Sequence, residues 1–159
     1  VYSEPGHGTT FRIVLPRAAP VEPMARGSDQ GAGSPGGHET VLVVEDEDSV
    51  RELVTQVLTM YGYTALSASN GAQALELLSD DGRSVDLVLT DVVMPVMSGP
   101  QLRERMMESQ PDTRVLFMSG YAADLTDAAM AGPDGRRRLL HKPFSTAELL
   151  RAVRESLDG

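Results

Sequence analysis

The sequence VLVVEDED, residues 41–48, sets four apolar residues directly before four acidic residues. A short uninterrupted apolar run is typical of a strand that is buried on both faces of a parallel sheet. Three further apolar runs end in the same way: LVLT at 87–90 before Asp91, VLFM at 115–118 before Ser119, and Leu139-Leu140-His141 before Lys142. The sequence therefore predicts several buried strands that each lead into a polar side chain.

Helical patterns separate these strands. The segment Ser49–Met60 is expected to form a helix, which Gly62 ends. The helix is predicted from apolar residues at helical spacing: Val50, Leu53, Val54, Val57 and Leu58. A last helix is expected after Ser145, which forms a capping box with Glu148. The buried stripe of that helix is predicted at Leu149, Leu150, Val153 and Leu157.

The remaining segments complete an alternating pattern of strands and helices. Strands are expected at 64–67, 86–90, 114–118 and 139–141, and helices at Ala72–Leu78, 100–109 and 124–130. Five successive strand–helix alternations indicate an α/β domain, in which a parallel sheet carries helices on both faces.

Residues 17–39 have the composition of a flexible linker. Gly, Pro, Ala and Ser fill 14 of these 23 positions. Such a segment buries too little apolar surface to offset the entropy lost on ordering. We therefore expect a short terminal segment at 1–16, a linker at 17–39 and one domain at 40–159.

Composition excludes several classes of function. The net charge is −9, from 23 acids and 14 bases, which disfavours a nonspecific nucleic-acid binder. The chain has no Cys, so it has no disulfide, thiolate metal site or Cys nucleophile. No apolar run is long enough for a transmembrane helix. Lys142 is the only Lys in the chain.

The polar residues that follow the strands form the strongest functional signal. In open α/β sheets, ligands bind beyond the carboxyl ends of the strands. We therefore expect Glu45, Asp46, Asp91, Ser119 and Lys142 to converge at one edge of the sheet. Each alone has a plainer interpretation, as part of a solvated acidic loop, a turn or the surface. Their joint placement at one edge favours a site.

Four segments in this order carry a resemblance to a known family: VLVVEDE at 41–47, LVLTDVVMPVMSG at 87–99, VLFMSG at 115–120 and HKPF at 141–144. They resemble response-regulator receiver domains, over residues 40–158. The resemblance implies a flavodoxin-like (βα)₅ fold whose five-stranded parallel sheet has the order 2-1-3-4-5. It also implies a two-component phosphorelay, in which a receiver accepts a phosphoryl group from phosphohistidine.

The resemblance implies a role for each residue of the expected site. Asp91 is the phosphoacceptor, Ser119 hydrogen-bonds the phosphoryl group and Lys142 pairs with it. Glu45 and Asp46, with Asp91 and the backbone carbonyl of Val93, hold Mg²⁺ or Mn²⁺. The Lys142–Pro143 peptide bond is cis in the family, which is cheap only before proline.

The chemistry of these residue types agrees with that role. A carboxylate can act as a nucleophile and form an acyl phosphate. Its attack brings anions together, and Mg²⁺ on oxygen ligands can neutralise the developing charge. A Lys ammonium is a compact cation for the opposite side.

The terminal segment VYSEPGHGTTFRIVLP, residues 1–16, carries a second resemblance. Gly6, Gly8 and Thr9 are similar to the last glycine box of a histidine-kinase ATP-binding domain, and the final strand follows. Sixteen residues cannot form a nucleotide pocket, so no ATP binding is expected. The implied parent is a hybrid sensor histidine kinase with a C-terminal receiver. The receiver is expected in the cytoplasm, and such a parent can be membrane-anchored through another part of its chain. The implied partners are a kinase phosphohistidine domain or a histidine phosphotransfer protein, with neither nucleic acid nor membrane contacted.

Three features depart from the family pattern. Glu45 stands where Asp is commoner, and its extra methylene shifts the carboxylate. Leu139 stands where many members have a switching Tyr or Phe, and Tyr121 is near enough in sequence to replace it. The segment after Met130 is rich in Gly and Pro, so the fourth helix is expected to be short.

Two other functional classes remain as alternatives. A phosphatase with an Asp nucleophile usually has a second acid two residues further on, where this chain has Val93. A receiver-like binding module that is never phosphorylated should lack part of the acid and Lys set, whereas this chain has all of it. A calcium loop is excluded, because no D-x-D-x-D-G run is present. Whether the fragment counts as an enzyme is left open, because a receiver assists its own phosphorylation.

Overall fold

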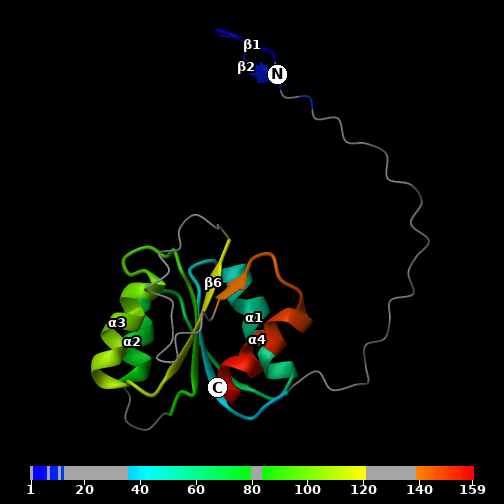
Figure 1. Cartoon of the computed structure of the whole chain (residues 1–159). Helices are drawn as coiled ribbons and strands as arrows, with labels where there is room; N and C mark the ends of the chain where they lie inside the picture. Colours follow the sequence, from blue (N-terminus) through cyan, green and yellow to red (C-terminus); the bar gives the residue numbers. More distant parts are fainter. Residues whose placement is uncertain (1, 7, 11, 13–35, 80–83, 121–138) are drawn as a thin grey trace, which may run out of the picture. The chain divides into compact units, whose positions relative to one another are not determined.

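The computed structural model of the chain describes residues 2–6, 8–10, 12, 36–79, 84–120 and 139–159 (Figure 1). The chain divides into two compact units, Val1–Ala32 and Gly33–Gly159. In the first unit, β1 (Tyr2–Glu4) pairs antiparallel with β2 (Gly8–Thr10). The expected helix at 124–130, Tyr121 and residues 17–35 of the expected linker lie outside the described residues.

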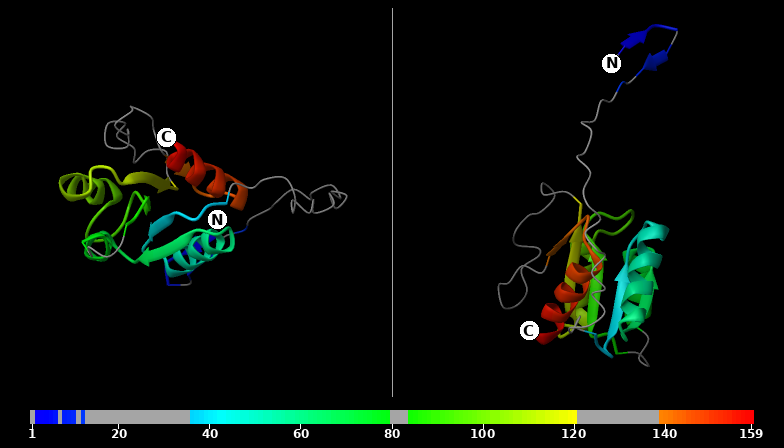
Figure 2. Two further views of the ribbon diagram at one scale, coloured as in Figure 1. Left: turned by 90° about the horizontal axis from the view of Figure 1, so that it is seen from below. Right: turned by 90° about the vertical axis from the view of Figure 1, so that its right-hand side faces the viewer.

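The second unit contains one parallel sheet. Its strands are β3 (Thr40–Val44), β4 (Thr64–Ala68), β5 (Leu87–Asp91), β6 (Arg114–Ser119) and β7 (Leu139–His141). They lie side by side in the order β4-β3-β5-β6-β7. Counted from β3, this is the order 2-1-3-4-5, which confirms the expected fold class. Figure 2 shows this unit from two further directions.

Four described helices cover the two faces of this sheet. They are α1 (Asp48–Met60), α2 (Gly71–Leu78), α3 (Gly99–Ser109) and α4 (Thr146–Asp158). Helices α1 and α4 lie on one side of the sheet, and α2 and α3 on the other (Figure 1). Among the residues that the structure describes, no helix is long and apolar enough to cross a membrane.

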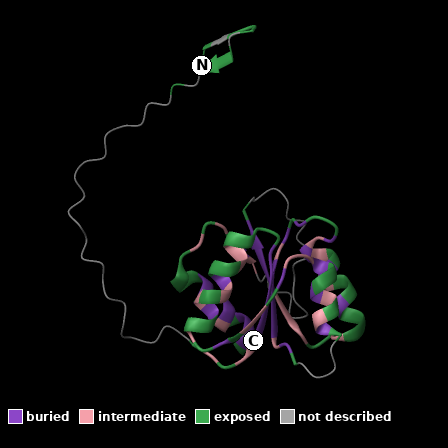
Figure 3. Ribbon diagram, turned by 180° about the vertical axis from the view of Figure 1, so that it is seen from behind, coloured by how far each residue is buried: buried purple, intermediate pink, exposed green. Residues whose placement is uncertain are grey.

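The apolar run of β3 divides between two hydrophobic cores. Successive strand residues point to opposite faces, so Val41 and Val43 pack under α1 and α4. Leu42 and Val44 pack under α2 and α3. All four are fully buried, and buried residues fill the strands at the centre of the unit (Figure 3). This two-sided burial explains why the run contains no polar residue.

The buried face of α1 is narrower than its run of apolar residues. Val54 and Leu58 are buried, whereas the side chain of Leu53 is 60% exposed. Leu53 lies about 100° around the helix from Val54, at the edge of the stripe that meets the sheet. In α4, the predicted capping box and the predicted buried stripe are both confirmed.

Residues 36–39, which composition assigned to the linker, contact the second unit. The Gly37 N–H donates to the carbonyl of Tyr61 at 3.2 Å, and the Thr64 N–H donates to the carbonyl of Glu39 at 3.0 Å. A Cβ at Gly37 would lie 2.4 Å from Cε1 of Tyr63, so the Tyr63 ring packs directly on this glycine. The packed unit therefore includes these four residues.

An ion pair joins the start of β3 to α4. Nη1 of Arg154 lies 2.8 Å from Oε1 of Glu39, and Nη2 lies 2.8 Å from Oδ1 of Asp158. Burial alone would raise the pKa of the Glu39 carboxyl, but hydrogen bonds from the backbone and from Arg154 outweigh it. The pKa of Glu39 therefore lies below its ordinary value.

We expect Glu39→Gln to lower the free energy of unfolding at neutral pH by about 0.5–1 kcal/mol, as for a partly exposed ion pair. Because folding lowers the pKa of Glu39, its contribution is present above the ordinary value of 4.5 and is lost as the pH falls through the lowered value. Urea unfolding at about pH 7 and about pH 3 should show the difference closing in acid. Glu155→Gln, at an exposed position of α4, is the control; an equal difference at both pH values would contradict the assignment.

Candidate functional site

The residues predicted to converge line one cavity at the carboxyl edge of the sheet. Asp91 ends β5, Ser119 ends β6, Lys142 follows β7, and Glu45 and Asp46 follow β3. The cavity has a volume of about 400 Å³ and these lining residues: Glu45, Asp46, Glu47, Asp91, Val92, Val93, Ser119, Gly120 and Lys142. The predicted convergence is therefore confirmed for the five side chains, and Val93 also lines the cavity. His38 and His141 are exposed and lie outside this lining.

Lys142 lies between two carboxylates. Its Nζ is 2.6 Å from Oε2 of Glu45 and 3.2 Å from Oδ1 of Asp91. Its backbone N–H donates to the carbonyl of Ser119 at 2.8 Å, which holds the start of this loop against β6. The Lys142–Pro143 peptide bond is cis, as the resemblance implied.

Burial and charge act in opposite directions on this pair. Glu45 is only 2% exposed, and burial raises the pKa of its carboxyl even though Lys142 partly offsets the effect. Burial alone would lower the pKa of Lys142, but the hydrogen bond to Glu45 and the nearby charge of Asp91 raise it overall. Lys142 is therefore held as a cation, and the Glu45 carboxylate depends on it for charge compensation.

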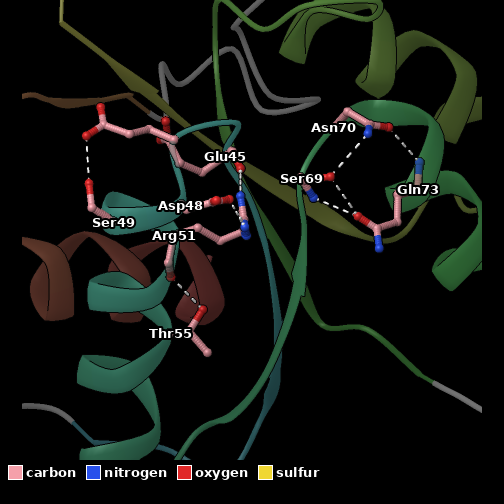
Figure 4. A network of polar contacts seen from close by, with 9 residues as sticks. Glu45, Asp48, Ser49, Arg51, Thr55, Ser69, Asn70 and Gln73 are labelled. Carbon is pink, nitrogen blue, oxygen red and sulfur yellow. Dashed lines mark hydrogen bonds and ion pairs between the residues drawn. The ribbon is translucent and has the colours of Figure 1, made fainter.

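The four acids after β3 have different surroundings. Three of them have side-chain partners: Glu45 pairs with Lys142, Glu47 accepts a hydrogen bond from Oγ of Ser49 at 2.6 Å, and Asp48 pairs with Arg51. Figure 4 shows the contacts of Ser49 and Arg51. Asp46 is exposed, and its carboxylate has no hydrogen bond or ion pair to the described residues. Asp46 is thus the acid whose oxygens are available to a ligand.

Three carboxylates form a group that fits a small divalent cation. Glu45, Asp46 and Asp91 each offer an oxygen, and these oxygens lie within 4.8 Å of one another. Mg²⁺ binds oxygen at 2.0–2.1 Å, so oxygens on opposite sides of the ion are about 4.1 Å apart. Hard oxygen donors at this separation fit Mg²⁺ with only a small adjustment. The extra methylene of Glu45 therefore does not remove its carboxylate from the group.

The chain after Asp91 is packed tightly against the site. The Gly99 N–H donates to the carbonyl of Val92 at 3.1 Å, so the loop returns to the end of β5. A Cβ at Gly99 would lie 2.4 Å from the carbonyl oxygen of Asp91. Only glycine lets the first turn of α3 approach Asp91 this closely, which fixes the backbone of that residue.

Leu139 and Ser119 are both packed into the fold near the site, and one residue of the site, Arg51, was not predicted. Leu139, at the position of the usual switching aromatic, packs with Phe117 and Val92. Ser119 is 3% exposed and lines the cavity. Sequence reasoning missed Arg51, whose guanidinium donates to the carbonyl of Glu45 at 2.7 Å. The available signal was its position in the first turn of the helix, three residues after Asp48.

Lys142→Met is expected to lower the free energy of unfolding by about 3 kcal/mol. Removing one partner of a buried pair leaves an uncompensated charge, and the low end of the usual range applies because the Lys142 side chain is 23% exposed. Glu45→Gln in the same variant should recover much of the loss, because it removes the charge that lacks a partner. Urea unfolding at neutral pH without metal ions measures both effects. A variant Lys142→Met as stable as the parent would show that Lys142 does not compensate Glu45.

Comparison with known proteins gives consistent relatives. Residues 41–154 match the response regulator receiver domain family. Sensor kinase CckA of Brucella abortus is 41% identical over a 164-residue alignment, which covers 98% of this chain and 17% of that protein. Response regulator receiver protein CpdR of Brucella abortus is 33% identical over 117 residues, which cover 74% of this chain and 95% of CpdR.

A solved structure supports the same likeness. The crystal structure of the receiver domain from hybrid histidine kinase CckA matches with a TM-score of 0.60 and 31% identity. The match covers 74% of this chain and 98% of that domain. This chain therefore spans a small part of CckA and nearly the whole of a single receiver.

Proposed function

We propose that Asp91 is the phosphoacceptor of this chain. The chain belongs to the response regulator receiver domain family and so has a phosphoacceptor role in two-component signalling. One observation carries this assignment: Asp91 ends a central strand inside the acidic cavity, with its Oδ1 3.2 Å from the Lys142 ammonium. A phosphatase with an Asp nucleophile is disfavoured, because the cavity lining supplies Val93 where its second acid would stand.

The proposed reaction is an in-line transfer. A carboxylate oxygen of Asp91 forms a bond to phosphorus as the P–N bond of phosphohistidine breaks, and the electron pair of that bond stays on the imidazole. Lys142 is placed to pair with a phosphoryl oxygen, because its ammonium already contacts Asp91. Ser119, on the neighbouring strand, is placed to donate its hydroxyl hydrogen to another phosphoryl oxygen.

The acidic group supports a metal assignment. Receiver domains generally bind Mg²⁺ at an acidic pocket, and we assign Glu45, Asp46, Asp91 and the backbone carbonyl of Val93 as ligands of Mg²⁺ or Mn²⁺. The bound ion would neutralise charge on the phosphoryl oxygens. Among the three acids, the Asp46 carboxylate is the most available to coordinate the ion, since it has no side-chain partner in the described part of the chain.

Receivers exchange phosphoryl groups with histidine-containing partners. For this chain we propose the phosphohistidine domain of a histidine kinase, a histidine phosphotransfer protein, or both. An exposed apolar side chain at the cavity supports a docking surface there: Val93 lines the cavity and is 60% exposed. The net charge of −9 disfavours nucleic acid as a partner.

We further propose a domain organisation for the parent protein. Residues 1–16 are assigned to the end of a histidine-kinase ATP-binding domain, 17–39 to a linker whose last four residues pack on the following domain, and 40–159 to the receiver. The alignment with sensor kinase CckA supports this, because it covers 98% of the chain and so extends well before the receiver. The parent would then be a hybrid histidine kinase whose receiver works in the cytoplasm.

Acetyl phosphate with Mg²⁺ should add one phosphoryl group to the parent chain, detected by intact mass. Asp91→Asn should abolish the addition, because an amide cannot form the acyl phosphate. Asp112→Asn, at an exposed position away from the cavity lining, is the matched control and should be phosphorylated like the parent. Phosphorylation that persists in Asp91→Asn would refute Asp91 as the acceptor.

Mg²⁺ should raise the melting temperature of the parent, because a ligand at 100 times its Kd stabilises the native state by about 2.7 kcal/mol. Asp46→Ala should reduce this response. Without metal, the same variant should be more stable than the parent by about 0.5 kcal/mol, because one of several crowded like charges is removed. Thermal unfolding with and without Mg²⁺ measures both effects; loss of metal-free stability in Asp46→Ala would make Asp46 a structural residue instead.

A further inference from the structure

Arg51 connects the first turn of α1 to the backbone of the acidic segment. Its Nη1 donates to the carbonyl oxygen of Glu45 at 2.7 Å, and its Nη2 pairs with Asp48 (Figure 4). The Arg51 side chain is 16% exposed, so both contacts are partly shielded from water. One guanidinium therefore bridges the residue that follows β3 and the residue that begins α1.

The Glu45 carbonyl needs this donor. Glu45 follows the last paired residue of β3 and is 2% exposed. Its N–H donates to the carbonyl of Ala68 at 3.1 Å, while its own carbonyl receives the Arg51 guanidinium. A buried carbonyl without a donor costs about 1–3 kcal/mol, so the loop would have to rotate to reach water if Arg51 were absent.

Such a rotation would move Asp46. The Glu45 carbonyl and the Asp46 nitrogen belong to one planar peptide unit, so the hydrogen bond from Arg51 fixes the direction in which the chain leaves residue 45. Asp46 has no side-chain partner among the described residues that could restore its place. The position of its carboxylate relative to Glu45 and Asp91 thus depends on the backbone.

We propose that Arg51 is a positioning residue of the cation site, which holds the Glu45–Asp46 peptide so that the Asp46 carboxylate faces the other two acids. This inference rests on the proposed Mg²⁺ assignment. The fork of the guanidinium suits the task, because one nitrogen reaches the carbonyl while the other contacts Asp48. Asp48 also offsets the charge of Arg51 and so limits its repulsion of a nearby cation.

A positioning role and a purely electrostatic role of Arg51 predict opposite changes in Mg²⁺ affinity when Arg51 is removed. If Arg51 acted only as a nearby cation, its removal would strengthen Mg²⁺ binding, because less positive charge would oppose the ion. If Arg51 positions the peptide, its removal weakens binding by about 10–100-fold, as is typical when a group that orients a metal ligand is lost. The sign of the change therefore separates the two explanations.

The test is an equilibrium titration of the full 159-residue chain with Mg²⁺, followed by calorimetry or thermal unfolding. We expect Arg51→Gln to raise the Kd by about 10–100-fold and Arg51→Lys to recover only part of the affinity, because an ammonium lacks the fork. Asp48→Asn keeps the bond to the Glu45 carbonyl and should raise the Kd by no more than about threefold. If Arg51→Gln does not fold, the Kd of Arg51→Lys is compared with that of the parent, and a higher Kd is expected.

A second readout separates positioning from general stability. With acetyl phosphate as donor, Arg51→Gln should need about tenfold more Mg²⁺ for half-maximal phosphorylation yet approach the parent rate at saturating Mg²⁺. An unchanged or lower Kd in Arg51→Gln, even with reduced metal-free stability, would overturn the inference. A parent chain that does not bind Mg²⁺ would overturn the metal assignment itself, and with it the role of Arg51.

Discussion

The ammonium of Lys142 compensates two carboxylates that the sheet forces together. Parallel strands end at one edge, so the residue after β3 and the last residue of neighbouring β5 must lie close. Glu45 and Asp91 occupy these positions, and Lys142 contacts both, at 2.6 and 3.2 Å. Buried like charges are unstable without such a partner. The strand order therefore creates the need for a nearby cation, and Lys142, which follows β7, supplies it.

The sequence predicted the sheet and the convergence because both follow from one-dimensional patterns. A strand that is buried on both faces has to be apolar throughout. The first residue after such an apolar run therefore lies at the carboxyl end of the strand, where the site is. The first residue of a helix is harder to predict, as in α3, which begins at Gly99, one residue before the expected start, because the Ser98 side chain caps the helix there. The exposure of Leu53 depends on which strip of α1 the sheet covers, which a periodic pattern defines only to within one residue.

Contacts between a side chain and the backbone were not predictable in the same way. The hydrogen bond from Arg51 to the Glu45 carbonyl joins residues six apart, and no residue type signals that a carbonyl at a strand end needs a donor. Gly37 was assigned to a linker by composition, although it packs on the ring of Tyr63. In both contacts one partner is a backbone group, of Glu45 or of Gly37. Every residue has such a group, so the residue type carries little information about the contact.

The charges of the cavity couple its two proposed ligands. The three carboxylates of the cation group and the Lys142 ammonium carry a net charge of about −2, and Glu47, which also lines the cavity of about 400 Å³, makes it about −3. A phosphoryl group alone would add to this repulsion, whereas a divalent cation would remove it and then attract the phosphoryl oxygens. Each ligand should therefore strengthen binding of the other, and by linkage the two effects on affinity must be equal. The Lys142 ammonium can attract the phosphoryl group fully only if its ion pair with Glu45 weakens. Binding of a cation to the Glu45 carboxylate would weaken this ion pair. Cation binding and the availability of Lys142 are thus two aspects of one electrostatic rearrangement.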